Sequence, residues 1–226
     1  MFLKKQKTIA LIVLGFAFLV GTSGAEPTSS SRPAYLANYV QIEGVPNFYK
    51  VSDDLYRGAQ PTAAGMRNLK AMGIRTVVNL RSFHSDRDKI GDTGLGCEDI
   101  HMKVWYPQER HVVKFLEIVT DSKRTPILVH CQHGADRTGT VCAVYRIAVQ
   151  GWTKEEALRE MTEGGFGFHG IWDNLIQWIN RLDIEKIKQR AGIDGIPLSF
   201  HDPKAFNHAR NRMYNSFDHS FLPDSP

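Results

Sequence analysis

The sequence predicts one α/β domain with a mostly parallel central sheet flanked by helices. Short apolar or β-branched runs alternate with helical patterns, which is typical of parallel sheets covered on both faces. The run Ile127-Leu128-Val129 follows a proline and is apolar throughout, as in a strand in the middle of a sheet. About 200 residues remain once an N-terminal leader is set aside, enough for one well-filled domain.

The first 25 residues have the pattern of an export signal. Three lysines precede an apolar run from Ile9 to Val20, and small residues follow up to Ala25. This order predicts a signal peptide over 1–25, cleaved after Ala25, and a periplasmic or secreted mature protein. The apolar run is shorter than the roughly 20 residues of a membrane span, so we expect no stable membrane association after cleavage. An uncleaved N-terminal anchor is the alternative.

Charge and cysteine content narrow the classes of function. The chain has 28 basic and 24 acidic residues, and loss of the leader with its three lysines leaves 25 against 24. Any positive potential must therefore be local, and we expect no nucleic-acid partner. Three cysteines are too few for a disulfide framework, and no Cys/His spacing of a metal site occurs. We expect neither a metal nor another cofactor.

The N-terminal half contains a linker, two short strands, a helix and a longer strand. Residues 26–44, rich in Ser and Pro at their start, predict the linker, and the main domain is expected over 45–192. Strands are expected over 48–51 and 55–57. Thr62 then caps a helix that Gly73 closes, and a β-branched strand follows over 74–80.

The remaining elements follow from polarity, capping residues and helical spacing. Residues 82–96 are polar and irregular, and they predict either a charged lid or a solvated loop. A strand over 100–104 and a helix over 111–121 come next, and a buried helix follows Gly139. Thr153 and Glu156 form a capping box that starts a helix to Glu163, and apolar spacing predicts another helix over 171–187. Residues 193–226 predict a C-terminal extension, packed or disordered.

The segment that joins the central strand to the buried helix carries the chemistry. A tight loop at a helix N-terminus directs several backbone N–H groups at one point, and the helix dipole adds positive charge there. Such a loop holds a dianion and favours a thiolate over a thiol. We predict that Cys131 attacks a phosphate bound by the loop, whose substrate-binding residues are Gln132, His133, Gly134, Ala135 and Asp136.

Arg137 and Thr138 complete the predicted catalytic set. The planar guanidinium of Arg137 matches two phosphate oxygens, and the Thr138 hydroxyl can donate a hydrogen bond to the thiolate. The strand before the cysteine, the two glycines and the helix after it supply the context that such a motif requires. The alternative is a structural cysteine at the end of a strand.

The run from His130-Cys131 to Arg137-Thr138 resembles the signature loop of the cysteine-dependent phosphatases of the tyrosine and dual-specificity type. Two N-terminal runs, 55–61 (LYRGAQP) and 73–81 (GIRTVVNLR), resemble the atypical dual-specificity phosphatases of plants, fungi and bacteria. The similarity extends from about Phe48 to Ala191. It implies a dual-specificity-phosphatase-like fold and a covalent cysteinyl-phosphate intermediate. Some members of this group, and related phytases with a tyrosine-phosphatase fold, act on inositol polyphosphates.

Phosphate ester cleavage also needs a proton for the leaving oxygen. The resemblance implies a carboxylic acid on a mobile segment upstream of the nucleophile, and the register points to Glu109, where the family typically has Asp. Asp99 and Asp121 are the alternatives. In a competing interpretation Glu109 only stabilises the N-terminus of the helix over 111–121.

Several other residues are candidates for supporting roles. Arg57 and Arg81, at strand ends, could add positive charge beside the phosphate and contact the substrate. His169 could bind substrate or be structural. Cys97 could form a reversible disulfide with Cys131, whereas Cys142 is expected to be a small core residue.

The sequence therefore predicts an exported phosphomonoester hydrolase. An exported enzyme meets few phosphotyrosine proteins of its own cell, which favours inositol polyphosphates such as inositol hexakisphosphate as substrates. A protein-tyrosine or dual-specificity phosphatase acting on a phosphoprotein is the alternative. A non-catalytic phosphate-binding module and a rhodanese-type sulfurtransferase are further hypotheses, but the complete Cys131–Arg137 pattern favours neither.

Overall fold

The computed structural model describes residues 36–194 of the chain. The predicted signal peptide over 1–25 lies outside the described residues, as does nearly all of the predicted extension over 193–226. Among residues 36–194, no helix has the length and apolar character that spanning a membrane would require.

Six strands form the central sheet in the order β1-β2-β3-β6-β4-β5. Strands β3, β6, β4 and β5 are parallel to one another, and β1 and β2 add an antiparallel edge, which confirms the mostly parallel sheet. Their bounds are β1 (Asn38–Tyr39), β2 (Tyr49–Lys50), β3 (Leu55–Gly58), β4 (Thr76–Asn79), β5 (Gly96–Asp99) and β6 (Ile127–His130). As predicted, the strand before the cysteine is internal.

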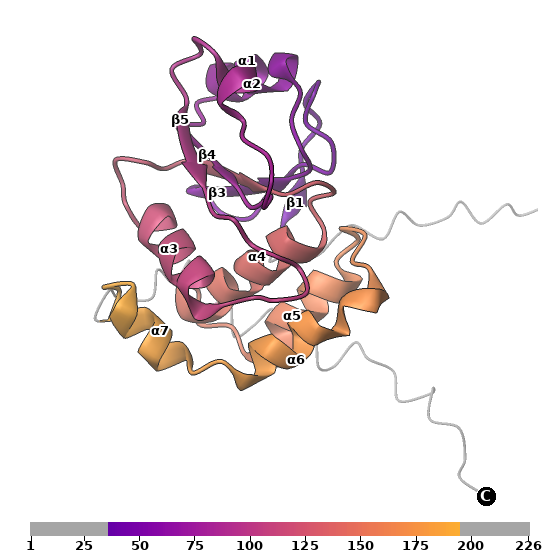
Figure 1. The fold of residues 1–226 in the computed structure, drawn as a ribbon, viewed down its shortest axis with the longest axis vertical. Coiled ribbons are helices and arrows are strands. Elements are labelled where there is room, and N and C mark those ends of the chain that lie inside the picture. The colour runs from indigo at the N-terminus through magenta and orange to yellow at the C-terminus, as the bar shows by residue number, and fades with distance from the viewer. Residues whose placement is uncertain (1–35, 195–226) are drawn as a thin grey trace, which may run out of the picture. The chain divides into compact units, whose positions relative to one another are not determined.

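Helices cover the sheet on both sides, as Figure 1 shows. Two lie on one side: α1 (Ala63–Ala71) and α2 (Arg87–Ile90). The other side holds α3 (Glu109–Val119), α4 (Asp136–Ala148), α5 (Lys154–Glu163), the 3-10 turn η1 (Gly170–Trp172), α6 (Asp173–Arg181) and α7 (Ile184–Arg190).

Alternation along β6 explains how the sheet is buried on both faces. Ile127 and Val129 pack into the core beneath α3 and α4, whereas Leu128 packs with Met66 and Leu69 of α1 on the opposite face. All three strand residues are fully buried. A run that is apolar throughout is what a strand with two covered faces requires.

Two predicted helix starts are confirmed in detail. The Thr62 side chain accepts a hydrogen bond from the N–H of Gly65 at 3.0 Å and caps α1. At α5, Thr153 and Glu156 form the reciprocal capping box that their spacing predicts.

The predicted strand over 100–104 is wrong, because the fifth strand is Gly96–Asp99. That strand lies at the edge of the sheet, where it pairs only with β4 and stays half exposed, so its sequence is polar. Ile100, Met102 and Val104 lie in the loop after β5, and their side chains are buried. Their burial produced an alternating pattern without a strand.

The single helix predicted over 171–187 is also wrong. The chain forms α6, leaves helical geometry at Leu182 and restarts as α7. The Asp183 side chain accepts a hydrogen bond from the N–H of Lys186 at 3.0 Å and caps the second helix. Both helices bury apolar residues, so the helical spacing continues across the break.

The described fold begins before the predicted start of the main domain at residue 45. Asn38 and Tyr39 form β1, within the segment 26–44 predicted as a linker. The N–H of Ala37 donates to Glu160, which also holds Arg146 in a buried bidentate ion pair. This N-terminal attachment depends on contacts far along the chain.

Candidate active site

The loop between β6 and α4 lies at the carboxyl edge of the parallel strands. Cys131, its first residue, is only 2% exposed. Gly134 has a φ of +72°, and a Cβ there would lie 2.5 Å from the carbonyl carbon and oxygen of Gly58. Only glycine allows this close approach of the loop to β3.

Four consecutive carbonyl groups of this loop are held by donors that lie outside it. His130 Nδ1 lies 3.1 Å from the carbonyl oxygen of Cys131, and the backbone N–H of Gln60 donates to that of Gln132 at 3.2 Å. Asn47 Nδ2 donates to the His133 carbonyl at 2.8 Å, and Arg57 Nη2 donates to the Gly134 carbonyl at 2.8 Å.

This anchoring fixes the direction of the backbone N–H groups. In a trans peptide the C=O of one residue and the N–H of the next point in opposite directions. The N–H groups of Gln132, His133, Gly134 and Ala135 therefore point away from the four anchors, toward the inside of the loop. None of them donates a hydrogen bond within residues 36–194. The loop is thus a concave set of donors beside Cys131, suited to an anion.

The first turn of α4 brings two further predicted residues to this loop. The Thr138 hydroxyl is fully buried and has no hydrogen-bond partner in the described part of the chain, which leaves it available to the Cys131 sulfur. Arg137 is half-buried one residue earlier, where its guanidinium can reach an anion in the loop.

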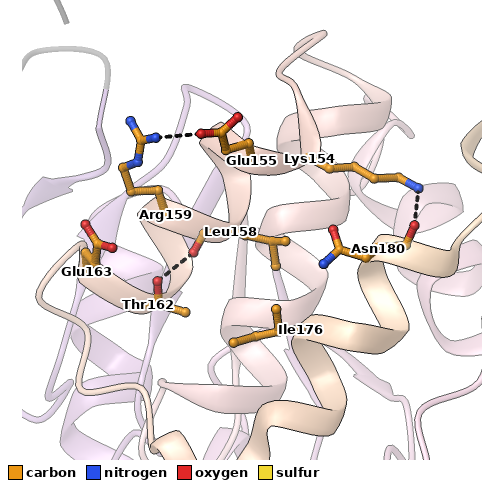
Figure 2. Close-up of a pocket in the computed structure, with 8 residues that line it drawn as sticks. All are labelled: Lys154, Glu155, Leu158, Arg159, Thr162, Glu163, Ile176 and Asn180. Carbon is orange, nitrogen blue, oxygen red and sulfur yellow. Dashed lines mark hydrogen bonds and ion pairs between the residues drawn. The ribbon is translucent and has the colours of Figure 1, made fainter. Parts of the chain in front are cut away.

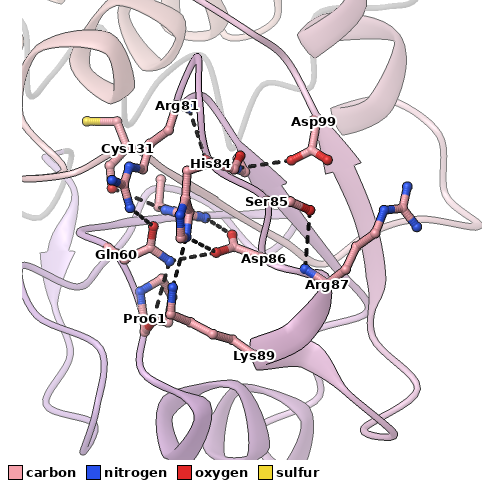
Figure 3. Close-up of polar contacts among 12 residues, drawn as sticks. Gln60, Pro61, Arg81, His84, Ser85, Asp86, Arg87, Lys89, Asp99 and Cys131 are labelled. Atoms are coloured by element: carbon pink, nitrogen blue, oxygen red, sulfur yellow. Dashed lines mark hydrogen bonds and ion pairs between the residues drawn. The ribbon is translucent and has the colours of Figure 1, made fainter.

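A buried histidine–aspartate pair lies beside the nucleophile loop, and Figure 3 shows its carboxylate, Asp86. His130 Nε2 lies 2.5 Å from Asp86 Oδ2, and both side chains are fully buried. His130 Nδ1 faces the Cys131 carbonyl and Nε2 faces the Asp86 carboxylate, and both of these groups accept hydrogen bonds. Burial acts to raise the pKa of Asp86, but the hydrogen bond and charge of His130 lower it overall.

Gln60 links this pair to the predicted substrate residue Arg81. Its side-chain amide donates to Asp86 Oδ1 at 2.6 Å and accepts from Arg81 Nη1 at 2.8 Å. Figure 3 shows the three side chains gathered beside Cys131. The structure therefore brings Arg81 to the site.

The polar loop over 82–96 contributes a histidine and a lysine to the same network. Lys89 Nζ lies 2.8 Å from His84 Nε2. Burial, followed by the charges of Arg81 and Lys89, lowers the pKa of His84. A neutral ring that accepts a hydrogen bond from the lysine fits this arrangement.

Asp136, predicted to bind substrate, is instead hydrogen-bonded to His169. Its carboxylate accepts from the His169 backbone N–H at 2.9 Å and from the ring Nδ1 at 2.9 Å. The His133 and His169 rings lie 5.3 Å apart at the rim of the loop. Asp136 thus fastens the loop after α5 to the nucleophile loop.

Arg57, another predicted substrate residue, lies behind the loop and is only 1% exposed. It reaches Gly134 from β3, and its guanidinium lies 3.6 Å from the Phe166 ring centroid. The structure therefore gives Arg57 no direct access to a substrate.

The predicted proton donor Glu109 is not brought to the loop. It is the first residue of α3, and its carboxylate lies 2.5 Å from Arg190 Nη1 and 3.8 Å from Lys186 Nζ, both on α7. Figure 1 shows α3 beside α7. Its role as the acid stays a prediction, and these two ion pairs give Glu109 a structural contact with α7 that differs from the predicted stabilisation of its own helix.

Within residues 36–194, neither alternative acid forms a hydrogen bond or ion pair with the nucleophile loop. Asp99 accepts a hydrogen bond from Asn79 at 3.0 Å where β4 and β5 end. Asp121 follows α3 and pairs with Arg124 just before β6, at the amino edge of the sheet. Since Cys131 follows β6, Asp121 is at the wrong edge for proton transfer to a leaving group.

The sheet register separates Cys97 from Cys131. Cys97 pairs with Val77, which pairs with Leu128 on the far side of β4. Two strand spacings amount to about 10 Å, and Cys131 lies three residues further along, whereas a disulfide requires Cα atoms within roughly 7 Å. A disulfide between them would need backbone rearrangement.

Burial raises the pKa of Cys142 to about 11, as expected for a core thiol.

A separate hollow lies between α5 and α6 (Figure 2). Its polar side chains are engaged locally: Lys154 donates to the Asn180 carbonyl, and Arg159 pairs with Glu155. It contains no nucleophile or anion-binding loop. Its lining residues are Lys154, Glu155, Leu158, Arg159, Thr162, Glu163, Ile176 and Asn180.

Asn47, Gln60 and Asp86 were missed as functional candidates from the sequence. Each lies more than 40 residues before Cys131. Asn47 and Gln60 donate hydrogen bonds to carbonyls of the loop, and Asp86 contacts His130, the residue before the loop. Of the three, only Asn47 has an unusual backbone conformation, a positive φ of 51°. Only the sheet topology brings the three together.

Comparison with known proteins agrees with this geometry. Residues 42–174 match the family model described as DSP-PTPase phosphatase fused to NAD+ kinase. The dual specificity protein phosphatase TpbA of Pseudomonas aeruginosa (strain UCBPP-PA14) is 33% identical over 212 residues, which cover 91% of this chain and 92% of that protein. The inositol diphosphatase DSP5 of Arabidopsis thaliana is 29% identical over 156 residues, covering 64% and 73%.

A solved structure of P. aeruginosa TpbA, with a cysteine replaced by serine and in complex with phosphotyrosine, is similar in fold. The TM-score is 0.64 at 29% identity, and the alignment covers 72% of this chain and 99% of that chain.

Replacement of Asp86 by Asn tests the buried pair. Because the folded-state pKa of Asp86 lies below its unfolded value, its stabilising effect is complete above about pH 4 and is lost as the pH falls. We expect Asp86→Asn to lower the free energy of unfolding at pH 7 by about 1–3 kcal/mol. Denaturant unfolding at pH 7 and pH 3 measures this.

The exposed Asp88→Asn on α2 is the matched control, expected to unfold like the parent at both values. An Asp86→Asn deficit as large at pH 3 as at pH 7 would contradict an ionised Asp86 in the folded protein.

Replacement of Glu109 by Gln tests the two interpretations of this residue. A general acid would matter more for alkyl than for aryl phosphates, because alkoxides leave less readily. From its ion pairs with α7, we expect an unchanged ratio of alkyl to aryl turnover and a loss of stability of about 0.5–1 kcal/mol. The exposed Glu117→Gln on the same helix is the control. A selective loss on alkyl phosphates would restore Glu109 as the acid.

Proposed function

Because the chain belongs to the family of DSP-type phosphatases, we propose that it cleaves phosphomonoesters through Cys131, with phosphotyrosine in proteins as the leading substrate class. The family match and the relatives make the chain a cysteine-dependent phosphatase. The observation that carries the residue assignment is the outward anchoring of four loop carbonyls, which directs the N–H groups of residues 132–135 at one point beside Cys131.

In the proposed mechanism the Cys131 thiolate attacks the phosphorus atom. The S–P bond forms as the ester P–O bond breaks, and the leaving oxygen takes a proton from solvent water. The N–H groups of the loop and the Arg137 guanidinium stabilise the charge on the three other phosphate oxygens. The Thr138 hydroxyl has no partner among residues 36–194, and we assign it a hydrogen bond to the sulfur during the reaction, which favours the thiolate as nucleophile and as leaving group. Water then attacks phosphorus, releases phosphate and restores the thiolate.

Exposed aromatic side chains in the segments after β4 and β5 support an aryl ester as substrate. Phe83 follows β4 and is 89% exposed, and Trp105 and Tyr106 follow β5 and are each 61% exposed. Because carboxyl ends of parallel strands meet at one edge, the segment that carries Phe83 leaves the sheet at the same edge as Cys131. The relative TpbA is named a dual specificity protein phosphatase, and a solved structure of TpbA holds phosphotyrosine.

Inositol polyphosphates are the second candidate substrate class. Cationic side chains at the same edge favour a substrate with several phosphates, and the similarity to plant inositol diphosphatases points the same way. Asp136 and Asp86 are each paired with a histidine, so neither carboxylate faces the cationic side chains as an unpaired negative charge. The cationic side chains are Arg81 and Lys89, in the network around Gln60 and His84, and Arg137 of α4.

We also propose that the enzyme acts outside the cytoplasm. The support is the order of basic, apolar and small residues over 1–25. A near-neutral mature chain is consistent with a site whose positive potential is local, since the leader removes three lysines.

Phosphate release from three substrates at equal concentration tests the proposal. We expect the parent to release phosphate from a phosphotyrosine peptide and an aryl phosphate faster than from inositol hexakisphosphate. We expect Cys131→Ser to abolish release from all three, because a hydroxyl is far less nucleophilic than a thiolate.

The half-buried Cys97→Ser is the matched control and should retain parent activity. Release from inositol hexakisphosphate alone would make the second candidate the substrate class. Turnover by Cys131→Ser, or sulfur transfer from thiosulfate by the parent, would contradict the proposed chemistry.

Expression of the full chain in a bacterium tests export. We expect the protein in the periplasmic or secreted fraction with an N-terminus at Glu26, because cleavage follows Ala25. Replacing the three leader lysines by Glu should retain it in the cytoplasm. A cytoplasmic parent that still begins at Met1 would contradict the proposal.

A further inference from the structure

Arg57 combines a buried charge with a contact to the nucleophile loop. It lies on β3, the strand next to β6, in register with Val129. Only 1% of the residue is exposed, so its guanidinium lies inside the protein behind the loop. The substrate side of the loop faces the other way, since the Gly134 carbonyl points toward Arg57.

The contacts of Arg57 leave its charge without a paired carboxylate. Nη2 donates to the Gly134 carbonyl at 2.8 Å, and the guanidinium lies over the Phe166 ring at 3.6 Å. Nε is buried without a hydrogen-bond partner, and Arg57 forms no ion pair within residues 36–194.

Glu160, the buried carboxylate whose charge acts on Arg57, is already paired with another residue. Glu160 accepts from Arg146 Nε at 2.7 Å and Nη2 at 2.6 Å, and from the N–H of Ala37 at 2.8 Å. Burial acts to raise the pKa of Glu160, but the guanidinium of Arg146 lowers it overall. These two charges therefore neutralise each other and leave Arg57 without an equal counter-charge.

A buried cation favours an anion nearby, because charges interact more strongly in the low-dielectric interior than in water. Burial lowers the pKa of Arg57, while Cys142, Glu160 and Cys131 nearby act to raise it. A guanidinium stays protonated under these conditions. Of these groups, Cys142 is held as a thiol by burial and Glu160 is paired, which leaves the loop as the place for an anion.

We propose that Arg57 is a positioning residue of this phosphatase that acts from behind the loop in two ways. Through Gly134 it holds one peptide so that the N–H of Ala135 points at the phosphate. Through its unpaired charge it stabilises the anion in the loop, first the Cys131 thiolate and then the bound phosphate. This inference rests on the proposed role of Cys131 as the nucleophile.

Two variants separate the charge of Arg57 from its hydrogen bond. Arg57→Gln removes the charge, whereas Arg57→Lys keeps a positive charge but loses the planar fork that reaches Gly134. Asn47→Ala is the matched control, because it removes another anchor, that of the His133 carbonyl, without changing any charge. The other ionisable groups around the thiol are unchanged in all variants: His130, Asp136, Arg137 and Cys142.

The experiment measures alkylation of Cys131 by iodoacetamide as a function of pH, with the modified peptide identified by mass spectrometry. This readout needs no substrate, so it does not depend on the substrate class. Inhibition by inorganic phosphate and the separate values of kcat and KM are measured on the same preparations. Loss of all activity in Cys131→Ser tests the nucleophile assignment independently.

For Arg57→Gln we expect the midpoint of Cys131 alkylation to rise by about one pH unit and inhibition by phosphate to weaken about tenfold. For Arg57→Lys we expect a midpoint near that of the parent with a lower kcat/KM. For Asn47→Ala we expect a higher KM and the parent midpoint.

An Arg57→Gln enzyme with the parent midpoint and parent inhibition by phosphate overturns the inference. If that variant does not fold, Arg57→Lys decides. A rise of its midpoint by a full unit, despite the retained charge, then assigns Arg57 to packing alone and overturns the inference as well.

Discussion

The direction of four peptide groups between Cys131 and Ala135 is the constraint on which the rest of the site depends. Each carbonyl is held from outside the loop, and planarity of the peptide then turns the following N–H inward. No side chain of the loop needs to contact a phosphate for this to work. The identity of residues such as Gln132 and His133, both exposed, can therefore vary more freely than that of the anchors.

The four anchors come from separate parts of the chain, and the parallel sheet is what collects them. Asn47 precedes β2, Arg57 lies in β3, Gln60 follows β3, and His130 ends β6. Parallel pairing of β3 with β6 places Gly58 opposite His130, so the segment after β3 runs beside the loop after β6. Asp86 and Asp136 then hold His130 and His169 and fasten two further loops to the same place. The catalytic geometry is thus a consequence of strand order.

Much of the fold and the centre of the site could be predicted because their signals are local. An apolar run after a proline predicted β6, Thr62 and Thr153 predicted two helix starts, and the Cys131–Arg137 spacing predicted the anion loop. The failures had physical causes. Edge strand β5 is half exposed and has a polar sequence, so it was not predicted as a strand. The break at Leu182 leaves the apolar spacing intact, so two helices were predicted as one. Arg57 was predicted at the substrate, because the sequence does not show which side of a strand end a long side chain takes. The pairing of Glu109 with α7 joins residues 81 positions apart, and no local pattern encodes it.

The central claim is that inward-pointing N–H groups of residues 132–135 bind the phosphate. It is tested most directly by amide NMR of the ¹⁵N-labelled protein during titration with inorganic phosphate. The account predicts the largest shifts at the amides of Gln132, His133, Gly134 and Ala135, with the Arg137 side chain next. Shifts concentrated on the hollow between α5 and α6, with the loop amides unmoved, would contradict it.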